Sequence, residues 1–231
     1  MRFVNLFSYL THLQADIVVN NDSVAALSSG TGGRCCGCVL VAGTGTIAFA
    51  RSRSGKSARS AGWGPLFLDA GSGYDIAQRT LAAVARAADG RGPATALSGA
   101  VARHLGLGDT AALMGWAYGQ EGWAAIAALA PLALEAAGAG DAVARKLVAE
   151  AAAGLLTSAS AAAKAAGLLD SGEPFLLVLS GSLLSRESSL CAAVVEGIHK
   201  QMPLASVIFP SVDAAIGAAL LAIANRDDLG P

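Results

Sequence analysis

The segment VLVAGTGTIAFARS, residues 39–52, decides the fold. Two runs of β-forming residues, 38–43 and 46–51, stand on either side of a tip built from glycine and threonine. Short β-forming runs separated by such residues are typical of an antiparallel hairpin. The sequence therefore predicts a hairpin with a two-residue turn at Thr44 and Gly45.

The predicted tip carries no bulky side chain. Gly43 and Gly45 can adopt positive φ and leave their N–H groups uncovered, while Thr44 and Thr46 add hydroxyl donors. Such a nest of donors suits anionic oxygens, and phosphate is the expected ligand. It is neither a P-loop nor a dinucleotide fingerprint. Glycine and threonine are also common in ordinary hairpin turns, so a turn without a ligand is the alternative.

Outward from the hairpin, the pattern predicts a mixed α/β fold. A long block of alanine-rich helical segments separates three early strands from the strands and helices near the C-terminus. One α/β domain with a helical insertion at about 74–167 fits this order. The expected strands are 16–20, 38–43, 46–51, one that follows the polar turn 51–62, 175–180 and 205–209; the expected helices are 22–29, 74–89, 94–105, 109–118, 121–137, 140–167, 186–201 and 213–225.

Composition limits the class of partner. The chain has 231 residues, 54% of them apolar, and a formal net charge of -1. A balanced charge gives no electrostatic footprint for nucleic acid or a membrane surface, so a small-molecule partner is expected. No window reads as a transmembrane helix and the N-terminus does not read as a signal peptide. We therefore expect a cytoplasmic protein.

The cysteines and histidines predict no metal site. Cys35, Cys36 and Cys38 are crowded together, but they lack the paired spacing of a zinc site and supply only three ligands. Reduced thiols in a cytosolic protein are the simpler interpretation. The three histidines lie far apart and outside any motif.

Asp22 is the first candidate for chemistry. It follows a predicted buried strand, at the end where α/β proteins bind ligands. A carboxylate there can accept the proton of, or orient, a hydroxyl group that attacks phosphorus. Capping of the next helix is the alternative role, and the two roles can coexist.

The segment AGWGPLFLDAGSGYDIA, residues 61–77, holds the second group of candidates. Gly62 and Gly64 flank Trp63, and Asp69 follows shortly before a helix. A flat indole with little in front of it and a nearby carboxylate suit a sugar ring. The alternative is a packed core tryptophan with Asp69 as a helix cap. The other two tryptophans, at positions 116 and 123, occur at helical spacing and are predicted to lie in the core.

The segment LSGSLLS, residues 179–185, repeats the pattern of a strand followed by small residues. At Gly181 and Ser182 the backbone can approach a ligand closely. A routine strand-to-helix turn is the alternative.

Taken in order, these motifs resemble a known family. Asn21-Asp22 with SVAAL, VAGTGT, AGWG with DAGSGYDIA, LSGSLL and the turn into DAAIGAALLA are similar to the second lobe of N-acetylglucosamine kinase and its BadF/BadG-type ATPase relatives. These belong to the superfamily of acetate and sugar kinases, heat-shock chaperones and actin. The similarity covers about residues 16–226 and implies a ribonuclease-H-like mixed sheet, an actin-like ATPase lobe, with a helical insertion.

The resemblance implies roles residue by residue. It implies an ATP-dependent kinase, with Mg²⁺ brought by the nucleotide, that phosphorylates the 6-hydroxyl of N-acetylglucosamine. Asp22 would be the catalytic carboxylate. The nucleotide would meet Gly43, Thr44, Gly45, Ala127, Gly181 and Ser182, and the sugar would meet Asp22, Thr46, Ile47, Gly62, Trp63, Gly64 and Asp69. Sugar kinases of this branch are often dimers, so the resemblance also suggests a homodimer.

Two departures from the family pattern affect these expectations. Family members often have glutamate where this chain has Ala70, which makes the sugar preference an open question. The first phosphate loop of the superfamily, an Asp-x-Gly-Gly-Thr-like hairpin, has no counterpart here. The resemblance therefore predicts a truncated kinase, with residues 1–33 as a remnant of the first lobe and 34–231 as the second lobe.

Two other functions stay open at this point. A BadF-type ATPase module activates a dehydratase through an iron–sulfur cluster held between two subunits, and the cysteines at 35–38 raise that alternative. The second is an inactive lobe that binds sugar or a partner without chemistry.

Overall fold

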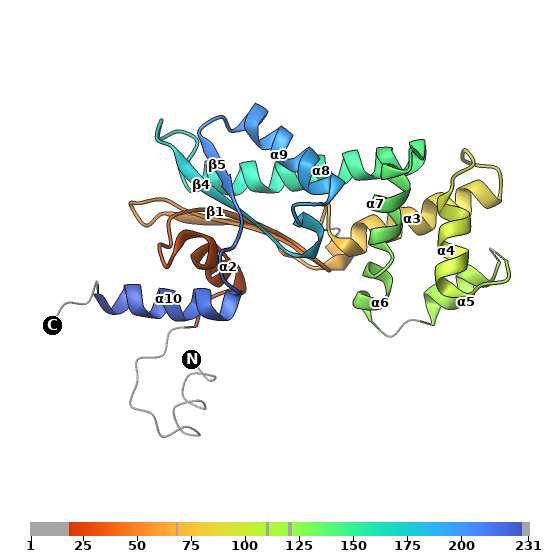
Figure 1. The fold of residues 1–231 in the computed structure, drawn as a ribbon, viewed down its shortest axis with the longest axis horizontal. Helices are drawn as coiled ribbons and strands as arrows, with labels where there is room; N and C mark the ends of the chain where they lie inside the picture. The colour runs from red at the N-terminus through yellow and green to blue at the C-terminus, as the bar shows by residue number, and fades with distance from the viewer. Residues whose placement is uncertain (1–18, 68, 110, 120–121, 228–231) are drawn as a thin grey trace, which may run out of the picture.

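The computed structural model describes residues 19–67, 69–109, 111–119 and 122–227, and its centre is a mixed five-stranded sheet (Figure 1). The strand order is β3-β2-β1-β4-β5. The two hairpin connections are antiparallel, whereas β4 pairs in parallel with both β1 and β5. The predicted α/β fold with a mixed sheet is confirmed. The strands are β1 (Gly37–Ala42), β2 (Thr46–Arg51), β3 (Ser57–Ala61), β4 (Phe175–Ser180) and β5 (Ala205–Ile208).

The opening hairpin forms where the sequence predicts it, but its turn is longer. Ala42 pairs with Thr46, so three residues rather than two make the tip. We call residues 43–45 the hairpin tip. Nearly every residue of β1 is buried because helices cover both of its faces, whereas β2, one strand nearer the edge of the sheet, alternates buried and half-buried residues.

Helices α2 (Asp22–Thr31) and α10 (Ala214–Asp227) cover one face of the sheet (Figure 1). Leu27 packs there with Val39 and Val178. Both helices run in the same direction, since Gly217 contacts the carbonyl of Ala25 while Leu220 lies against Gly33 farther along. The C-terminus of α10 points away from the hairpin tip in Figure 1, so α2 begins at the end that faces the tip.

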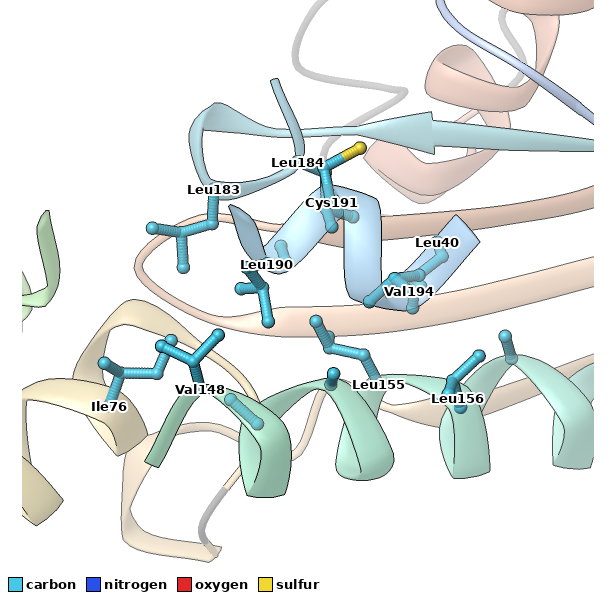
Figure 2. Close-up of a cluster of buried hydrophobic side chains, with 14 of the residues drawn as sticks. Leu40, Ile76, Val148, Leu155, Leu156, Leu183, Leu184, Leu190, Cys191 and Val194 are labelled. Atoms are coloured by element: carbon cyan, nitrogen blue, oxygen red, sulfur yellow. The ribbon is translucent and has the colours of Figure 1, made fainter. Parts of the chain in front are cut away.

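Helices α8 (Ala142–Ala165) and α9 (Ser189–Gln201) cover the opposite face. Figure 2 shows how their apolar side chains meet those of β1, the short helix η2 (Ser182–Leu184) and helix α3 (Gly73–Ala88). The interlocked side chains include Leu40, Ile76, Leu155, Leu190 and Val194, each at most 1% exposed. Burying a large aliphatic side chain contributes roughly 1.5–3 kcal/mol, so this cluster is the main source of stability.

The remaining helices form a block beside the sheet, at the right of Figure 1. They are α3, α4 (Leu97–Leu105), α5 (Ala112–Tyr118), α6 (Trp123–Ala127) and α7 (Ala130–Gly138), with the 3-10 turn η1 (Pro65–Phe67) ahead of them. Among the described helices, none is both long and apolar enough to cross a membrane alone. Residues 123–138 and 142–165 are long and apolar enough only when taken together, and the two segments meet at a bend of 118°.

Several boundaries differ from the sequence prediction. The sequence predicts a polar turn over 51–62, but only 52–56 form the turn and strand β3 follows directly. Serines are tolerated in β3 because it is an exposed edge strand. The predicted helix 121–137 is two helices, with a break before Pro131. Most of the predicted strand 16–20 lies outside the described residues, and its last two residues are not in a strand.

Candidate nucleotide and sugar site

The predicted site residues converge on one edge of the sheet. Strands β1, β3, β4 and β5 all run in the same direction, so their carboxyl ends lie along a single edge. The hairpin tip, Trp63 and Ser182 each follow one of these ends. Helix α3 also begins there, and the first turn of α2 faces the same side. This is the edge at which open α/β sheets bind ligands.

A cavity of about 190 Å³ lies against the hairpin tip, and we call it the tip cavity. It brings together four residues that sequence reasoning assigned to a nucleotide: Gly43, Thr44, Ala127 and Ser182. Five further lining residues were not predicted, namely Gly73, Ala124, Ala128, Pro131 and Leu183. The described lining holds small residues and hydroxyl groups but no carboxylate. This chemistry suits the oxygens of a phosphate.

The tip glycines do not have the conformation that the sequence predicted. Neither Gly43 nor Gly45 is among the described residues with positive φ, so the nest of left-handed residues does not form. The three-residue turn removes the need for it. A Cβ atom at Gly43 would meet no atom within 4 Å. Neither backbone geometry nor internal packing requires glycine at position 43, and the space in front of the backbone is open.

Helix α3 holds the hairpin tip through backbone hydrogen bonds. The amide of Gly73 donates to the carbonyl of Gly43 at 2.7 Å, and the amide of Tyr74 donates to the carbonyl of Thr44 at 3.3 Å. A Cβ atom at Gly73 would lie 3.0 Å from the Gly43 oxygen, so a glycine allows the close approach. The tip is therefore fixed by its carbonyl groups, which leaves the Thr44 side chain exposed.

Ser72 and Asp75 set where α3 begins. The Ser72 hydroxyl accepts from the amide of Asp75 at 3.1 Å, and the Asp75 carboxylate accepts from the amide of Gly71 at 2.9 Å and from Arg79 at 2.7 Å. This is a capping arrangement, and both acidic and hydroxyl groups suit the positive end of a helix. The cap is Ser72, so the alternative in which Asp69 caps the helix is wrong.

Asp69 instead holds the segment that contains Trp63. Its two carboxylate oxygens accept from the amides of Trp63 at 3.0 Å and Gly64 at 2.9 Å, and the residue is 5% exposed. One oxygen would lie 3.7 Å from a Cβ atom at Gly45. Asp69 thus ties the Trp63 segment to the hairpin tip. Its contact with a sugar hydroxyl stays a prediction.

Trp63 is exposed rather than packed in the core. Its exposed fraction is 67%, and the guanidinium of Arg59 lies 5.3 Å from the centre of the ring. Positive φ at Ala61 and Gly62 turns the chain outward before the indole. Phe67, with its ring centre 6.4 Å from that of Trp63, is exposed as well. An open aromatic surface at the edge of the sheet fits the predicted sugar wall.

The prediction that Trp123 lies in the core is wrong. Trp123 is 51% exposed and contacts Tyr74 edge to face, with ring centres 5.3 Å apart. The short helix α6 has too few turns to bury its large residue on both sides. The contact nevertheless joins α6 to α3 and so shapes the tip cavity. Trp116 packs against the core as expected.

The structure separates the side chains of Thr46 and Ile47. Neighbouring residues of a strand face opposite sides of the sheet. Thr46 is 3% exposed, and its hydroxyl has no partner among the described residues. Ile47 lies on the α2 face, where it would be 3.0 Å from a Cβ atom at Gly62. The two side chains therefore do not line one surface, and their predicted contacts with the sugar stay predictions.

Asp22 is exposed in the first turn of α2 and does not line the tip cavity. The cap of α2 is Asn21, whose side chain accepts from the amide of Ser23 at 3.0 Å. The capping role that the sequence left open for Asp22 is thus taken by its neighbour. Asp22 begins α2, which covers the face of the sheet opposite to α8.

Comparison with known proteins identifies the family. The sequence profile of the BadF/BadG/BcrA/BcrD ATPase family matches residues 6–222. The chain belongs to this family. It is also 37% identical over 224 residues to an N-acetyl-D-glucosamine kinase of Dictyostelium discoideum, a match that covers 95% of the chain and 70% of the relative. An N-acetylmuramic acid/N-acetylglucosamine kinase of Clostridium acetobutylicum is 30% identical over 213 residues, which are 91% of the chain and 68% of that protein.

Solved structures support the same assignment. A Chromobacterium violaceum protein, provisionally named N-acetylglucosamine kinase, superposes with a TM-score of 0.69 at 29% identity, over 94% of this chain and 71% of that one. A Porphyromonas gingivalis protein with the same provisional name shares the fold at 17% identity, with a TM-score of 0.61 over 89% of this chain and 66% of that one. The fold predicted from the motif order is therefore that of the N-acetylglucosamine kinases.

The backbone of this BadF/BadG-type fold requires glycine at position 181. Its φ is +96°, and a Cβ atom would lie 2.2 Å from the carbonyl oxygen of Ala42. Only glycine lets β4 turn into η2 against the end of β1. This turn places Ser182 in the tip cavity. Gly181 itself supports the cavity and is not part of its lining.

The cysteines of this family member do not converge as ligands. Cys38 is fully buried beneath α8, and burial raises the pKa of its thiol to about 12. Cys35 and Cys36 are only half-buried, and Cys35 packs on the α2 face instead. Within the described residues, no group of three or more His, Cys, Asp or Glu side chains could hold a metal ion.

Proposed function

We propose that this chain takes part in ATP-dependent phosphorylation of the 6-hydroxyl of N-acetylglucosamine. The observation that carries the proposal is the tip cavity, which joins Gly43 and Thr44 of the hairpin to Ala127 and to Ser182, which follows the neighbouring parallel strand β4. The 37% identity to an N-acetyl-D-glucosamine kinase supports the choice of reaction. The phosphates of ATP would lie at the tip, and Mg²⁺ would neutralise part of their charge.

The sugar would lie between the tip and Trp63. The exposed indole provides a flat apolar surface for the ring or the acetamido methyl group. Asp69 holds this surface at a fixed distance from the tip, so the acceptor hydroxyl and the phosphate would be positioned by one rigid unit. Positioning of this kind is a main contribution of enzymes to phosphoryl transfer.

Asp22 would accept the proton of the 6-hydroxyl as its oxygen attacks the γ-phosphorus. The bond to the bridging oxygen breaks, ADP leaves, and the proton passes to the carboxylate. The exposed position of Asp22, with Asn21 as the helix cap, leaves the carboxylate available for this role.

A coupled assay of ADP release tests the proposal. The chain is supplied with MgATP and, in turn, with N-acetylglucosamine, N-acetylmuramic acid, glucosamine and glucose. We expect ADP release that depends on the acetamido sugars and is weak with the other two. Turnover that ignores the sugar, or absence of turnover with all four, would contradict the kinase role.

Calorimetry with ATP and with N-acetylglucosamine separately distinguishes the inactive sugar-binding lobe. That function predicts a sugar affinity without any turnover. Analysis of metal and sulfide in protein purified without oxygen tests the dehydratase-activating module, which requires an iron–sulfur cluster. We expect neither iron nor sulfide in stoichiometric amount.

A further inference from the structure

We propose that a second cavity binds a small organic phosphate monoester. This cavity, of about 880 Å³, lies at the amino edge of the sheet, opposite the tip cavity. It is lined by the residues before β1, the β2–β3 turn, the chain between α8 and β4, and one residue of β5. We call it the amino-edge cavity. Its volume is within the range of about 300–1,000 Å³ that is typical of small-molecule sites.

Cationic side chains dominate this cavity. Its lining includes Arg34, Arg53 and Lys56 against one carboxylate, that of Glu173, so the charged groups sum to +2. The pair between Arg53 and Glu173 spans 3.5 Å, with both side chains more than half exposed. Such an exposed pair is weak, so a phosphate can compete with Glu173 for the Arg53 guanidinium. Arg34 and Lys56 have no ion-pair partner within the described residues.

Apolar side chains also line the amino-edge cavity, and we call them its apolar floor. Leu168, Phe175 and Leu176 contribute apolar surface. The lining also includes Ser52, Ser54 and Ser171, whose hydroxyl groups hydrogen-bond within the chain and keep lone pairs or a proton for a ligand. Arginine and lysine bind phosphate oxygens through charge-assisted hydrogen bonds, and hydroxyl groups add neutral ones. The apolar floor would contact the carbon skeleton of the ligand. A phosphate dianion matches the surplus of two positive charges better than a monocarboxylate does.

The proposal does not depend on the kinase function. The two cavities share no lining residue and occupy opposite edges of the sheet. Gly37 lines the amino-edge cavity where β1 begins, and at φ +128° it lies so close to β4 that a Cβ atom would be 2.6 Å from the Leu176 oxygen. A ligand at this edge could occupy its site while the tip cavity is empty or filled.

Calorimetry in a buffer without phosphate tests the binding, with glucose 6-phosphate as the probe. Glucose is its uncharged control, and inorganic phosphate shows whether the carbon skeleton contributes. We expect saturable binding of glucose 6-phosphate, weaker binding of inorganic phosphate and none of glucose at this site. Cys36 lines the cavity and is half-buried, so its alkylation by iodoacetamide should slow when the probe is bound.

Three variants locate the site. Arg34→Gln combined with Lys56→Gln should weaken probe binding at least about tenfold, since two charge-assisted contacts are lost. Arg103→Gln with Lys146→Gln removes the same charge from exposed positions elsewhere and should change the affinity by less than about twofold. Glu173→Gln removes the only described carboxylate of the lining and should strengthen binding about two- to fivefold.

Equal weakening by both double variants would show diffuse electrostatic attraction and overturn the proposal. So would an unchanged affinity in the Arg34 and Lys56 variant, because binding would then occur elsewhere, for example in the tip cavity. Absence of saturable binding, or alkylation of Cys36 at an unchanged rate under saturation, would also overturn it. These outcomes are independent of ADP release, so failure here leaves the kinase proposal standing.

Discussion

Asp69 accepts a hydrogen bond from the backbone amide of Trp63 at 3.0 Å, and this bond joins the two halves of the candidate site. The carboxylate lies beside Gly45 of the hairpin tip, whereas the indole lies on the open surface. A buried carboxylate that accepts two backbone N–H groups makes strong, directional bonds. One side chain therefore anchors the Trp63 segment, the proposed sugar side of the site, next to the hairpin tip.

Asp69→Asn should loosen this connection. The amide has one acceptor oxygen, so one of the two backbone N–H groups would face an N–H₂ group and lose its partner. We expect the free energy of unfolding to fall by about 1–3 kcal/mol and N-acetylglucosamine to bind less tightly. Urea unfolding and calorimetry measure the two effects. The control Asp89→Asn affects only exposed contacts with Arg91, namely an ion pair and a hydrogen bond from its amide, and a loss as large as that of Asp69→Asn would contradict the account.

Asp22→Asn should affect turnover far more than sugar affinity. The carboxamide has nearly the same shape as the carboxylate but cannot accept the proton of the sugar hydroxyl. General-base catalysis contributes roughly 10²–10⁴-fold, so kcat should fall by about that factor. Steady-state assays give kcat and KM, with the exposed Asp170→Asn as a control. An equal loss in affinity and in turnover would argue that Asp22 only binds the sugar.

Gly71→Ala should destabilise the fold more than a comparable change at another left-handed glycine. Gly71 has φ +77°, and a Cβ atom would lie 2.5 Å from Leu155 and 2.6 Å from the carbonyl of Ala151. Gly32 has φ +64° with no atom within 4 Å. We expect a loss of at least about 3 kcal/mol for Gly71→Ala, against about 1–2 kcal/mol for Gly32→Ala, where only backbone strain contributes. If urea unfolding gives similar losses in the free energy of unfolding for the two variants, the contact between position 71 and helix α8 adds no cost, which would contradict this packing.

Stability should decrease in alkaline solution because of Cys38. Burial raises the pKa of this thiol from an ordinary 9.0 to about 12, so between these values the unfolded chain loses a proton that the folded chain retains. The contribution is fully present below pH 9 and is lost as the pH rises toward 12. The limiting slope is about 1.4 kcal/mol per pH unit. Urea unfolding between pH 8 and 10.5 under reducing conditions should show a smaller slope for Cys38→Ala, and an unchanged slope would contradict the assignment.

Elements with a strong local signal could be predicted from the sequence. The apolar run of β4 matches the predicted 175–180 residue for residue, because a strand whose central residues 177–179 are buried on both faces leaves a nearly continuous apolar pattern. The serine-rich strand β3 could not be found in this way, since its pairing with β2 rather than its composition makes it a strand. Tertiary pairing overrides local propensity at such an edge.

In the candidate site, too, some features could be predicted from local sequence and others depend on tertiary packing. Gly43, Thr44 and Ser182 were predicted from motifs and Ala127 from the family resemblance, and the four residues meet in one cavity. The role of Asp69 as a backbone acceptor and the exposure of Trp123 depend on how loops pack, which a linear pattern does not specify. Gly73 carried a detectable signal, since a glycine directly before a helix allows close contact with a neighbouring backbone.

The affinity for ATP of Gly43→Ala tests the central claim most directly. Position 43 has no positive φ and no atom within 4 Å of an added Cβ, so the variant should be as stable as the unmodified chain. If phosphates approach the hairpin tip, the added methyl group occupies their space, and calorimetry should show ATP binding weakened at least about tenfold, or about 1.4 kcal/mol. An affinity equal to that of the unmodified chain would contradict the assignment of the tip cavity to the nucleotide.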